Sequence, residues 1–194
     1  TDIEQDGQIE LSKDIHNNIY VKSNGSNNFI DITMSESVYA NNNSSAPILI
    51  SDFAIAFNQN NGNASSVSIN SIKKNDNVAQ GSASVLTGGE SIIRVFLNVN
   101  GTPSGDETIS ISPIDGSSIF DEVGNVMLAS NTTGLKNLKD ELLPSISSVF
   151  LSADNSTVSV TMSESVFNTN GGSGNLEASD FVFSISGGAA SLTS

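Results

Sequence analysis

Acidic side chains recur at one fixed spacing along this chain. Glu36 and Asp52 lie beside alternating apolar segments, and Glu164 and Asp180 occupy the same places in a second copy of the pattern. Carboxylates brought together repel one another unless a cation neutralises them. Calcium suits such a group because it takes about 6–8 oxygen ligands and needs neither His nor Cys. Alternatively, Asp52 and Asp180 are turn residues that bond their own backbone, and the two glutamates are simply solvated.

The acids belong to a longer internal repeat. The string Thr-Met-Ser-Glu-Ser-Val occupies 33–38 and again 161–166, so the offset in numbering is 161 − 33 = 128. Ser51-Asp52-Phe53 recurs at the same offset as Ser179-Asp180-Phe181. A six-residue identity within a matching apolar pattern indicates a tandem array, and arrays serve reach, spacing and adhesion more often than catalysis.

Period-two alternation of apolar and polar residues dominates the chain and predicts half-buried strands. The apolar members fall in seven groups: 30, 32 and 34; 53, 55 and 57; 67 and 69; 93, 95, 97 and 99; 109 and 111; 158, 160 and 162; and 181, 183 and 185. Turn signals separate the strands at Asn24-Gly25, Asn61-Gly62, Gly88-Gly89, Asn100-Gly101 and Asp115-Gly116. Short strands with regular turns predict an all-β fold, an immunoglobulin-like antiparallel sandwich.

The repeat also predicts domain boundaries. Residues 135–140 should be the last strand of one complete repeat spanning 15–140, and residues 9–14 resemble them. Residues 1–14 are therefore predicted to be the last strand of a preceding repeat, and residues 141–194 the first part of a following one. Either the array continues beyond both ends, or neighbouring subunits supply the missing strands.

Immunoglobulin topology would gather several of the acids at one end of the complete repeat. The strand ends near residues 36 and 52 and the loop before the last strand should meet there, together with the linker that enters the domain. The predicted calcium ligands of this repeat are Asp14, Glu36, Asp52, Asp121 and Asn125. Those of the following junction are Asp140, Glu141, Glu164 and Asp180.

Composition limits the classes of function. The formal net charge of −14 argues against nucleic acid and against an anionic membrane surface as partners. No apolar run approaches the ~20 residues of a membrane-spanning helix. Cysteine is absent, and the single histidine, His16, lies near a linker and is expected to be a surface residue. No catalytic motif is present, so we expect no enzyme activity.

The motifs in their order resemble the bacterial Ig-like repeats of very large surface proteins. The order is Thr-Met-Ser-Glu-Ser-Val, Ser-Asp-Phe, then Ile-Phe-Asp-Glu-Val-Gly-Asn at 119–125 and Leu-Leu-Pro-Ser-Ile-Ser-Ser-Val at 142–149. Such repeats typically read Val-Thr-Phe-Ser-Glu-x-Val, Leu-x-x-x-Asp-Phe, Ile-x-Asp-x-Ala-Gly-Asn and Ala-Pro-x-Ile. The resemblance implies a secreted protein of the adhesin, surface-layer or motility-associated type, and some related arrays bind calcium between domains.

These observations predict an extracellular segment that extends, spaces or presents other domains, with calcium stiffening the junctions. Its partners would be neighbouring repeats of the same chain or identical subunits. A subunit of a filament or surface layer that exchanges strands is the alternative. A glycan- or ice-binding module is a further alternative, and the shortage of aromatic residues weakens glycan binding.

Overall fold

The computed structural model describes residues 9–10, 20–23, 26–189 and 191. Contacts between residues divide the chain into two units, and the division falls between Leu142 and Leu143. Each unit is described by itself. The regular structure in the described ranges consists of antiparallel strands and two short 3₁₀ turns, so the all-β prediction is confirmed. Among these residues, no helix has the length and apolar character needed to cross a membrane.

The first unit contains a five-stranded antiparallel sheet with the strand order β1-β2-β3-β6-β5. Its strands are β1 (Ile9–Glu10), β2 (Tyr20–Ser23), β3 (Phe29–Val38), β5 (Ser66–Lys74) and β6 (Glu90–Asn100). Within the segment predicted to close a preceding repeat, residues 9–10 form β1 and pair with β2. The chain positions of β3, β5 and β6 agree with the predicted alternation.

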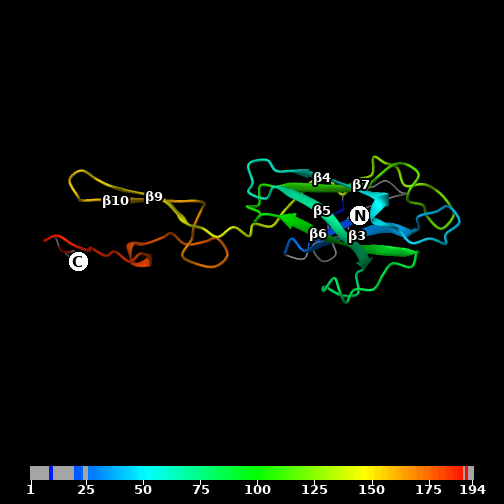
Figure 1. Ribbon diagram of the computed structural model, residues 1–194, viewed down its shortest axis with the longest axis horizontal. Helices are drawn as coiled ribbons and strands as arrows, with labels where there is room; N and C mark the ends of the chain where they lie inside the picture. The colour runs from blue at the N-terminus through cyan, green and yellow to red at the C-terminus, as the bar shows by residue number, and fades with distance from the viewer. Residues whose placement is uncertain (1–8, 11–19, 24–25, 190, 192–194) are drawn as a thin grey trace. The chain divides into compact units, whose positions relative to one another are not determined.

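A second sheet in the same unit has the order β4-β7-β8. β4 (Phe53–Asn58) and β7 (Thr108–Pro113) lie side by side, as Figure 1 shows, and β8 (Lys136–Asn137) adds a short edge. The predicted last strand at 135–140 is therefore present but shorter than expected, because only Thr108 and Ile109 of β7 pair with it.

One apolar core joins the two sheets. Alternation along β3 turns Ile30, Ile32 and Met34 inward, where β6 adds residues such as Ile93 and Val95, and none of the five is more than 5% exposed. The second sheet contributes Phe53, Ile109 and Ile111 to the same cluster. Fully burying one such side chain is worth about 1.5–3 kcal/mol, so this shared core is the main force that holds the sheets together.

The predicted turn at Gly88-Gly89 shows why glycine is needed there. Both residues have positive φ, 93° and 84°, just before β6 begins. A Cβ on Gly89 would lie 2.8 Å from the Tyr39 hydroxyl oxygen. A side chain at this position would therefore meet both backbone strain and a steric clash.

The second unit contains an antiparallel hairpin of β9 (Ile146–Leu151) and β10 (Val158–Met162), followed by the 3₁₀ turn η2 (Ala178–Asp180). The strand predicted from Phe181, Phe183 and Ile185 was wrong, because these residues form no strand in the structure. The equivalent β4 pairs with β7 in the first unit. Within the described part of the second unit, no such partner lies beside residues 181–185, and Val182 is 98% exposed.

The β9–β10 hairpin has the same register as β2 and β3. Thr161 pairs with Ser148 and Val160 with Val149. Shifted back by the repeat offset, these pairs become Thr33 with Tyr20 and Ile32 with Val21, which β3 and β2 form. The pairing of β10 with β9 becomes irregular after Thr161, and that of β3 with β6 becomes irregular after Thr33. The repeated string thus lies at a strand irregularity in both units.

Candidate functional site

The loop predicted to supply Asp121 lies against the end of β3. The Tyr39 N–H donates to the Phe120 carbonyl oxygen and the Phe120 N–H donates to that of Tyr39, both at 2.8 Å. The Ser44 hydroxyl donates to the Glu122 carbonyl oxygen at 2.6 Å. The β3–β4 loop and the 119–126 loop are therefore neighbours at one end of the first unit, in line with the sequence-based expectation.

Asp121 uses its carboxylate to close its own loop. Its Oδ1 accepts hydrogen bonds from the backbone N–H groups of Val123 (2.9 Å) and Asn125 (2.7 Å). Its Oδ2 accepts one from the Asn125 side-chain amide at 2.7 Å. Burial acts to raise the pKa of Asp121, but these hydrogen bonds outweigh it and hold the pKa below its ordinary value of 3.8. Asp121 and Asn125, two of the predicted calcium ligands, are therefore close together, and they form hydrogen bonds with each other.

Asp52 and Asp180 perform one task at equivalent positions. The Leu49 N–H donates to Asp52 Oδ2 at 2.7 Å and closes η1 (Ile50–Asp52), the 3₁₀ turn that precedes β4. The Glu177 N–H donates to Asp180 Oδ2 at 2.8 Å and closes η2 in the same way. Both aspartates therefore bond their own backbone, which is the alternative that the sequence left open.

The other predicted calcium ligands accept few hydrogen bonds or are exposed. Glu36 is exposed on β3. Asp140 accepts a hydrogen bond from the Leu142 N–H at 2.9 Å, and Glu141 accepts one from the Asn27 N–H at 3.4 Å. Glu164 is half-buried, and its Oε1 is buried with no hydrogen-bond partner. Asp14 and His16 lie outside the described residues.

The fit of these residues to calcium is partial. Within the described ranges, no three His, Cys, Asp or Glu side chains gather closely enough to hold a metal ion. Carboxylate oxygens of Asp52, Asp121 and Asp180 accept hydrogen bonds from backbone N–H groups. Glu164 Oε1 has no hydrogen-bond partner that would compete with a cation. Calcium binding at these residues stays a prediction.

A buried ion pair lies on the outer face of the five-stranded sheet, and sequence reasoning missed it. The Arg94 Nε and Nη2 atoms donate to the two oxygens of Asp31 at 2.7 and 2.6 Å, and Nη1 donates to the Asn77 carbonyl oxygen at 2.7 Å. The guanidinium lies 3.9 Å above the centre of the Phe29 ring, which packs edge-on against Phe96. The sequence signal for this ion pair was the chain's single arginine, which lies within the apolar run Ile-Ile-Arg-Val-Phe-Leu.

A second missed residue is Glu107, which is fully buried. Its Oε1 accepts a hydrogen bond from the Ala64 N–H at 2.6 Å, and its Oε2 accepts from the N–H groups of Ser104 (3.0 Å) and Gly105 (3.2 Å). Burial acts to raise the pKa of Glu107, but the backbone N–H groups outweigh it and hold the pKa below 4.5. This carboxylate joins the loop before β5 to the loop after β6.

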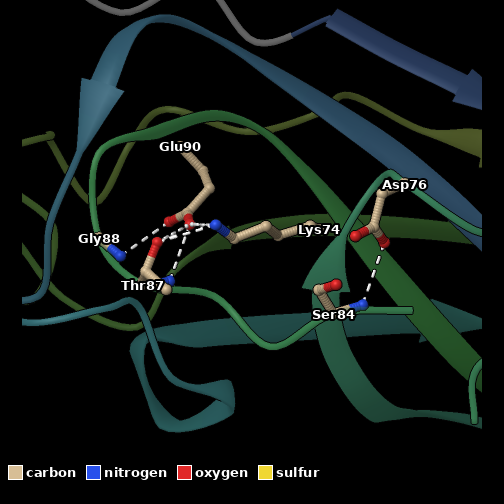
Figure 2. A network of polar contacts seen from close by, with 6 residues as sticks. All are labelled: Lys74, Asp76, Ser84, Thr87, Gly88 and Glu90. Carbon is tan, nitrogen blue, oxygen red and sulfur yellow. Dashed lines mark hydrogen bonds and ion pairs between the residues drawn. The ribbon is translucent and has the colours of Figure 1, made fainter. Parts of the chain in front are cut away.

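The polar network shown in Figure 2 closes the loop between β5 and β6. Glu90 accepts hydrogen bonds from the N–H groups of Thr87 (2.7 Å) and Gly88 (2.9 Å), and Lys74 Nζ lies 3.2 Å from Glu90 Oε1. Asp76 Oδ1 accepts from the Ser84 N–H at 3.0 Å. Every carboxylate in this network bonds the backbone of its own loop, which is an arrangement for loop closure.

An open groove of about 570 Å³ lies beside β5 and is mostly apolar. Its lining consists of Pro47, Ile48, Leu49, Ile50, Ser51, Ser71, Ile72, Lys73, Val85 and Leu86. Lys73 is the one charged residue in this lining, and no aromatic ring faces a sugar-sized ligand there. The groove offers neither the paired carboxylates nor the aromatic platform of a glycan-processing cleft.

Comparisons with known proteins give no independent assignment. No protein-family model, no curated protein and no solved structure matches this chain.

Proposed function

We propose that this chain is a structural segment of a secreted cell-surface protein, in which tandem Ig-like repeats extend, space or present other domains. One observation carries the proposal: the β9–β10 hairpin and the β2–β3 hairpin share a register at the offset of the sequence repeat. The capped turns at Asp52 and Asp180 recur at the same offset. Recurrence of sequence, register and cap supports repeated units of one fold.

The architecture of the first unit supports the Ig-like part of the proposal. Two antiparallel sheets share a single core, and their strands alternate between inward apolar and outward polar residues. Carboxylates of Asp52, Glu90, Glu107 and Asp121 bond backbone N–H groups at the loops. Closed loops on a shared core make a stiff module, which suits spacing, and we propose no catalytic role.

The proposed location is outside the cell, and surface labelling tests it. An antibody raised against the chain should label intact cells of the source organism before their membranes are made permeable. Protease added to intact cells should remove the signal. Labelling that requires permeable cells would contradict the extracellular assignment.

A filament or surface-layer subunit that exchanges strands is the second candidate. The exposed apolar residues of the second unit favour it, because Val149, Phe150 and Leu151 are 52–68% exposed. Sedimentation of the full chain separates the two candidates. The spacer proposal expects a monomer, and strand exchange expects oligomers that grow with concentration.

Calcium-stiffened junctions are the remaining part of the proposal. The buried and unpartnered Glu164 Oε1 supports a cation near this residue, and a hard oxygen donor suits calcium. The resemblance to bacterial Ig-like repeats points in the same direction. Thermal unfolding measured with calcium and with a chelator tests this part.

A further inference from the structure

Four Asn-Gly pairs occur in this chain, and an Asn-Gly pair is able to lose its side-chain amide without an enzyme. The pairs lie at 24–25, 61–62, 100–101 and 170–171, and the first of them is outside the described residues. The structure holds the next two pairs in place and leaves the last one open.

Loss of the amide begins at the backbone nitrogen of the glycine. This nitrogen bonds to the side-chain carbonyl carbon of the asparagine, and the amide leaves as ammonia with the proton of the attacking N–H. A cyclic succinimide remains, and water opens it at either carbonyl to an aspartyl or an isoaspartyl linkage. Glycine favours the ring closure because it has no Cβ beside the attacking nitrogen.

The Asn61-Gly62 pair is held by hydrogen bonds and by packing. The Gly62 N–H, whose nitrogen would attack, donates to the Gln59 carbonyl oxygen at 2.8 Å. The Gly62 carbonyl oxygen accepts from the Gln59 side-chain amide at 3.1 Å. A Cβ placed on Gly62 would overlap the buried Glu107 side chain. The nitrogen is therefore engaged, and its backbone has little room to turn toward the Asn61 side chain.

The Asn100-Gly101 pair is held at the end of β6. The Asn100 side-chain amide donates to Ser65 Oγ at 3.0 Å, and the Asn100 carbonyl oxygen accepts from the Ser65 N–H at 2.8 Å. A Cβ on Gly101 would lie 3.1 Å from the Asn63 carbonyl oxygen. Both the reacting side chain and the peptide group between the two residues are therefore fixed.

The Asn170-Gly171 pair is open. Both residues are exposed, and a Cβ on Gly171 would meet no atom within 4 Å. Among the residues that the structure describes, neither the Asn170 side chain nor the Gly171 N–H has a hydrogen-bond partner. Nothing therefore holds the nitrogen away from the side-chain carbonyl carbon.

The open pair lies at the tip of a loop whose base is closed in the same way in both units. Thr169 Oγ1 lies 2.9 Å from Ser173 Oγ. At the repeat offset, the Asn41 side-chain amide donates to Ser45 Oγ at 3.0 Å. Residues 170–172 thus form the tip of a loop that the first unit also contains.

The loop of the first unit shows that this tip stays exposed when another loop lies against it. Asn42 and Asn43 occupy the positions of the open pair. The neighbouring Ser44 bonds the 119–126 loop, and yet Asn42 and Asn43 are both exposed. Exposure is therefore a property of the tip, and the second unit differs in having glycine after the asparagine.

We propose that Asn170 is a site of spontaneous deamidation, at which a succinimide formed with Gly171 opens to aspartyl and isoaspartyl products. The reaction adds a negative charge to the loop, and the isoaspartyl product also lengthens the main chain by a carbon atom. The equivalent Asn42 is protected because Asn43 has a side chain beside the attacking nitrogen. This inference depends on the loop alone and stands apart from the proposed spacer role.

Incubation of the full chain in mildly alkaline buffer, followed by digestion and mass spectrometry, tests the proposal. Asn170 should lose its amide about tenfold faster than Asn61 and Asn100. Isoaspartyl product should accumulate at Asn170, since direct hydrolysis of the side chain gives aspartate alone. In denaturant, Asn61 and Asn100 should react as fast as Asn170, because the hydrogen bonds that hold them are lost.

A substitution in the first unit tests the role of the loop. Asn43→Gly places an Asn-Gly pair at the equivalent tip, and Asn42 should then lose its amide about tenfold faster than in the unmodified chain. Asn43→Ser is the matched control, because it shortens the side chain but keeps the Cβ. Asn42 should remain slow in that variant.

Three outcomes would overturn the proposal. Equal rates at Asn170, Asn61 and Asn100 in the folded chain mean that the open tip does not select the site. Aspartyl product alone at Asn170 means that no succinimide forms. An Asn42 that is no faster in the Asn43→Gly chain than in the Asn43→Ser chain means that this loop does not permit ring closure.

Discussion

Asn27 and Lys139 are 112 positions apart in the sequence and are joined by two hydrogen bonds. The Asn27 side-chain amide donates to the Lys139 carbonyl oxygen, and the Lys139 N–H donates to Asn27 Oδ1, both at 2.8 Å. Asn27 is 8% exposed and precedes β3, whereas Lys139 follows β8. The Asn27 side chain thus bonds both backbone groups of Lys139, as a neighbouring strand would, and links the end of the first unit to the segment before β3.

Replacing Asn27 should loosen this closure. Asn27→Ala leaves a backbone N–H and C=O without partners, and we expect a loss of about 2 kcal/mol in the free energy of unfolding. Denaturant unfolding measures the loss, and Asn28→Ala at the exposed neighbouring position is the control. Equal stability of the two variants would show that the two hydrogen bonds contribute nothing net.

The buried pair of Arg94 and Asp31 should be strongly coupled. Their side chains are 9% and 14% exposed, so removing either partner leaves a buried charge and should cost about 3–5 kcal/mol. The double variant Asp31→Leu/Arg94→Met should cost much less than the sum of the single variants. A double-mutant cycle measures the coupling energy, and additive losses would contradict it. Lys74→Met breaks a more exposed pair, 34% exposed at Lys74, and should cost less than about 1 kcal/mol.

Acid should destabilise the first unit through Glu107. Its pKa in the folded state lies below 4.5, so its stabilising effect is complete above pH 4.5 and is lost as the pH falls through the folded value. Asp121 adds to the same trend below its ordinary value of 3.8. Unfolding midpoints measured at decreasing pH should fall, and Glu107→Gln should have a lower midpoint near neutral pH and a flatter acid slope. An unchanged slope would contradict this role.

The turn between β9 and β10 should contain an unusually acidic carboxyl group. Asp154 accepts hydrogen bonds from the Ser152 and Ser156 hydroxyls at 2.6 and 2.8 Å, and from the Ser156 N–H at 3.1 Å. These bonds lower the pKa of Asp154 from 3.8 to about 2. NMR titration of the carboxyl carbon measures this value. Ser156→Ala should raise the pKa toward 3.8, and a normal pKa in the unmodified chain would show that the turn is open in solution.

Calcium should raise the thermal unfolding midpoint if it binds at Glu164. A ligand that binds only the folded state stabilises that state by mass action. We expect a midpoint several degrees higher in calcium than in chelator, and Glu164→Gln should reduce the difference. Asp52→Asn should lower the midpoint equally in calcium and in chelator, because Asp52 caps η1. An identical midpoint in both solutions would remove calcium from the proposal.

Local patterns in the sequence predicted β3, β4, β5, β6, β7 and β10, because period two needs only neighbouring residues, but the alternating groups did not include β2 or β9. The alternation at Ile30 and Ile32 predicted β3, and the repeated motif predicted where β10 lies. The same reasoning failed at Phe181–Ile185, where the alternation is present and the strand is absent. A strand needs a neighbour to complete its hydrogen bonds, and no local pattern supplies that neighbour.

Only the tertiary structure decided what the charged residues do. The spacing of Asp52 and Asp180 was read from the sequence, but their role as turn caps depends on backbone geometry. Arg94 binds Asp31 from 63 residues away and Glu107 binds the Ala64 N–H from 43 residues away, and neither spacing carries a recognisable signal. Period, repeat and net charge are therefore properties of the sequence itself. The pairing of Asp31 with Arg94 and of Glu107 with Ala64 is settled when two sheets close on one core and bring distant segments together.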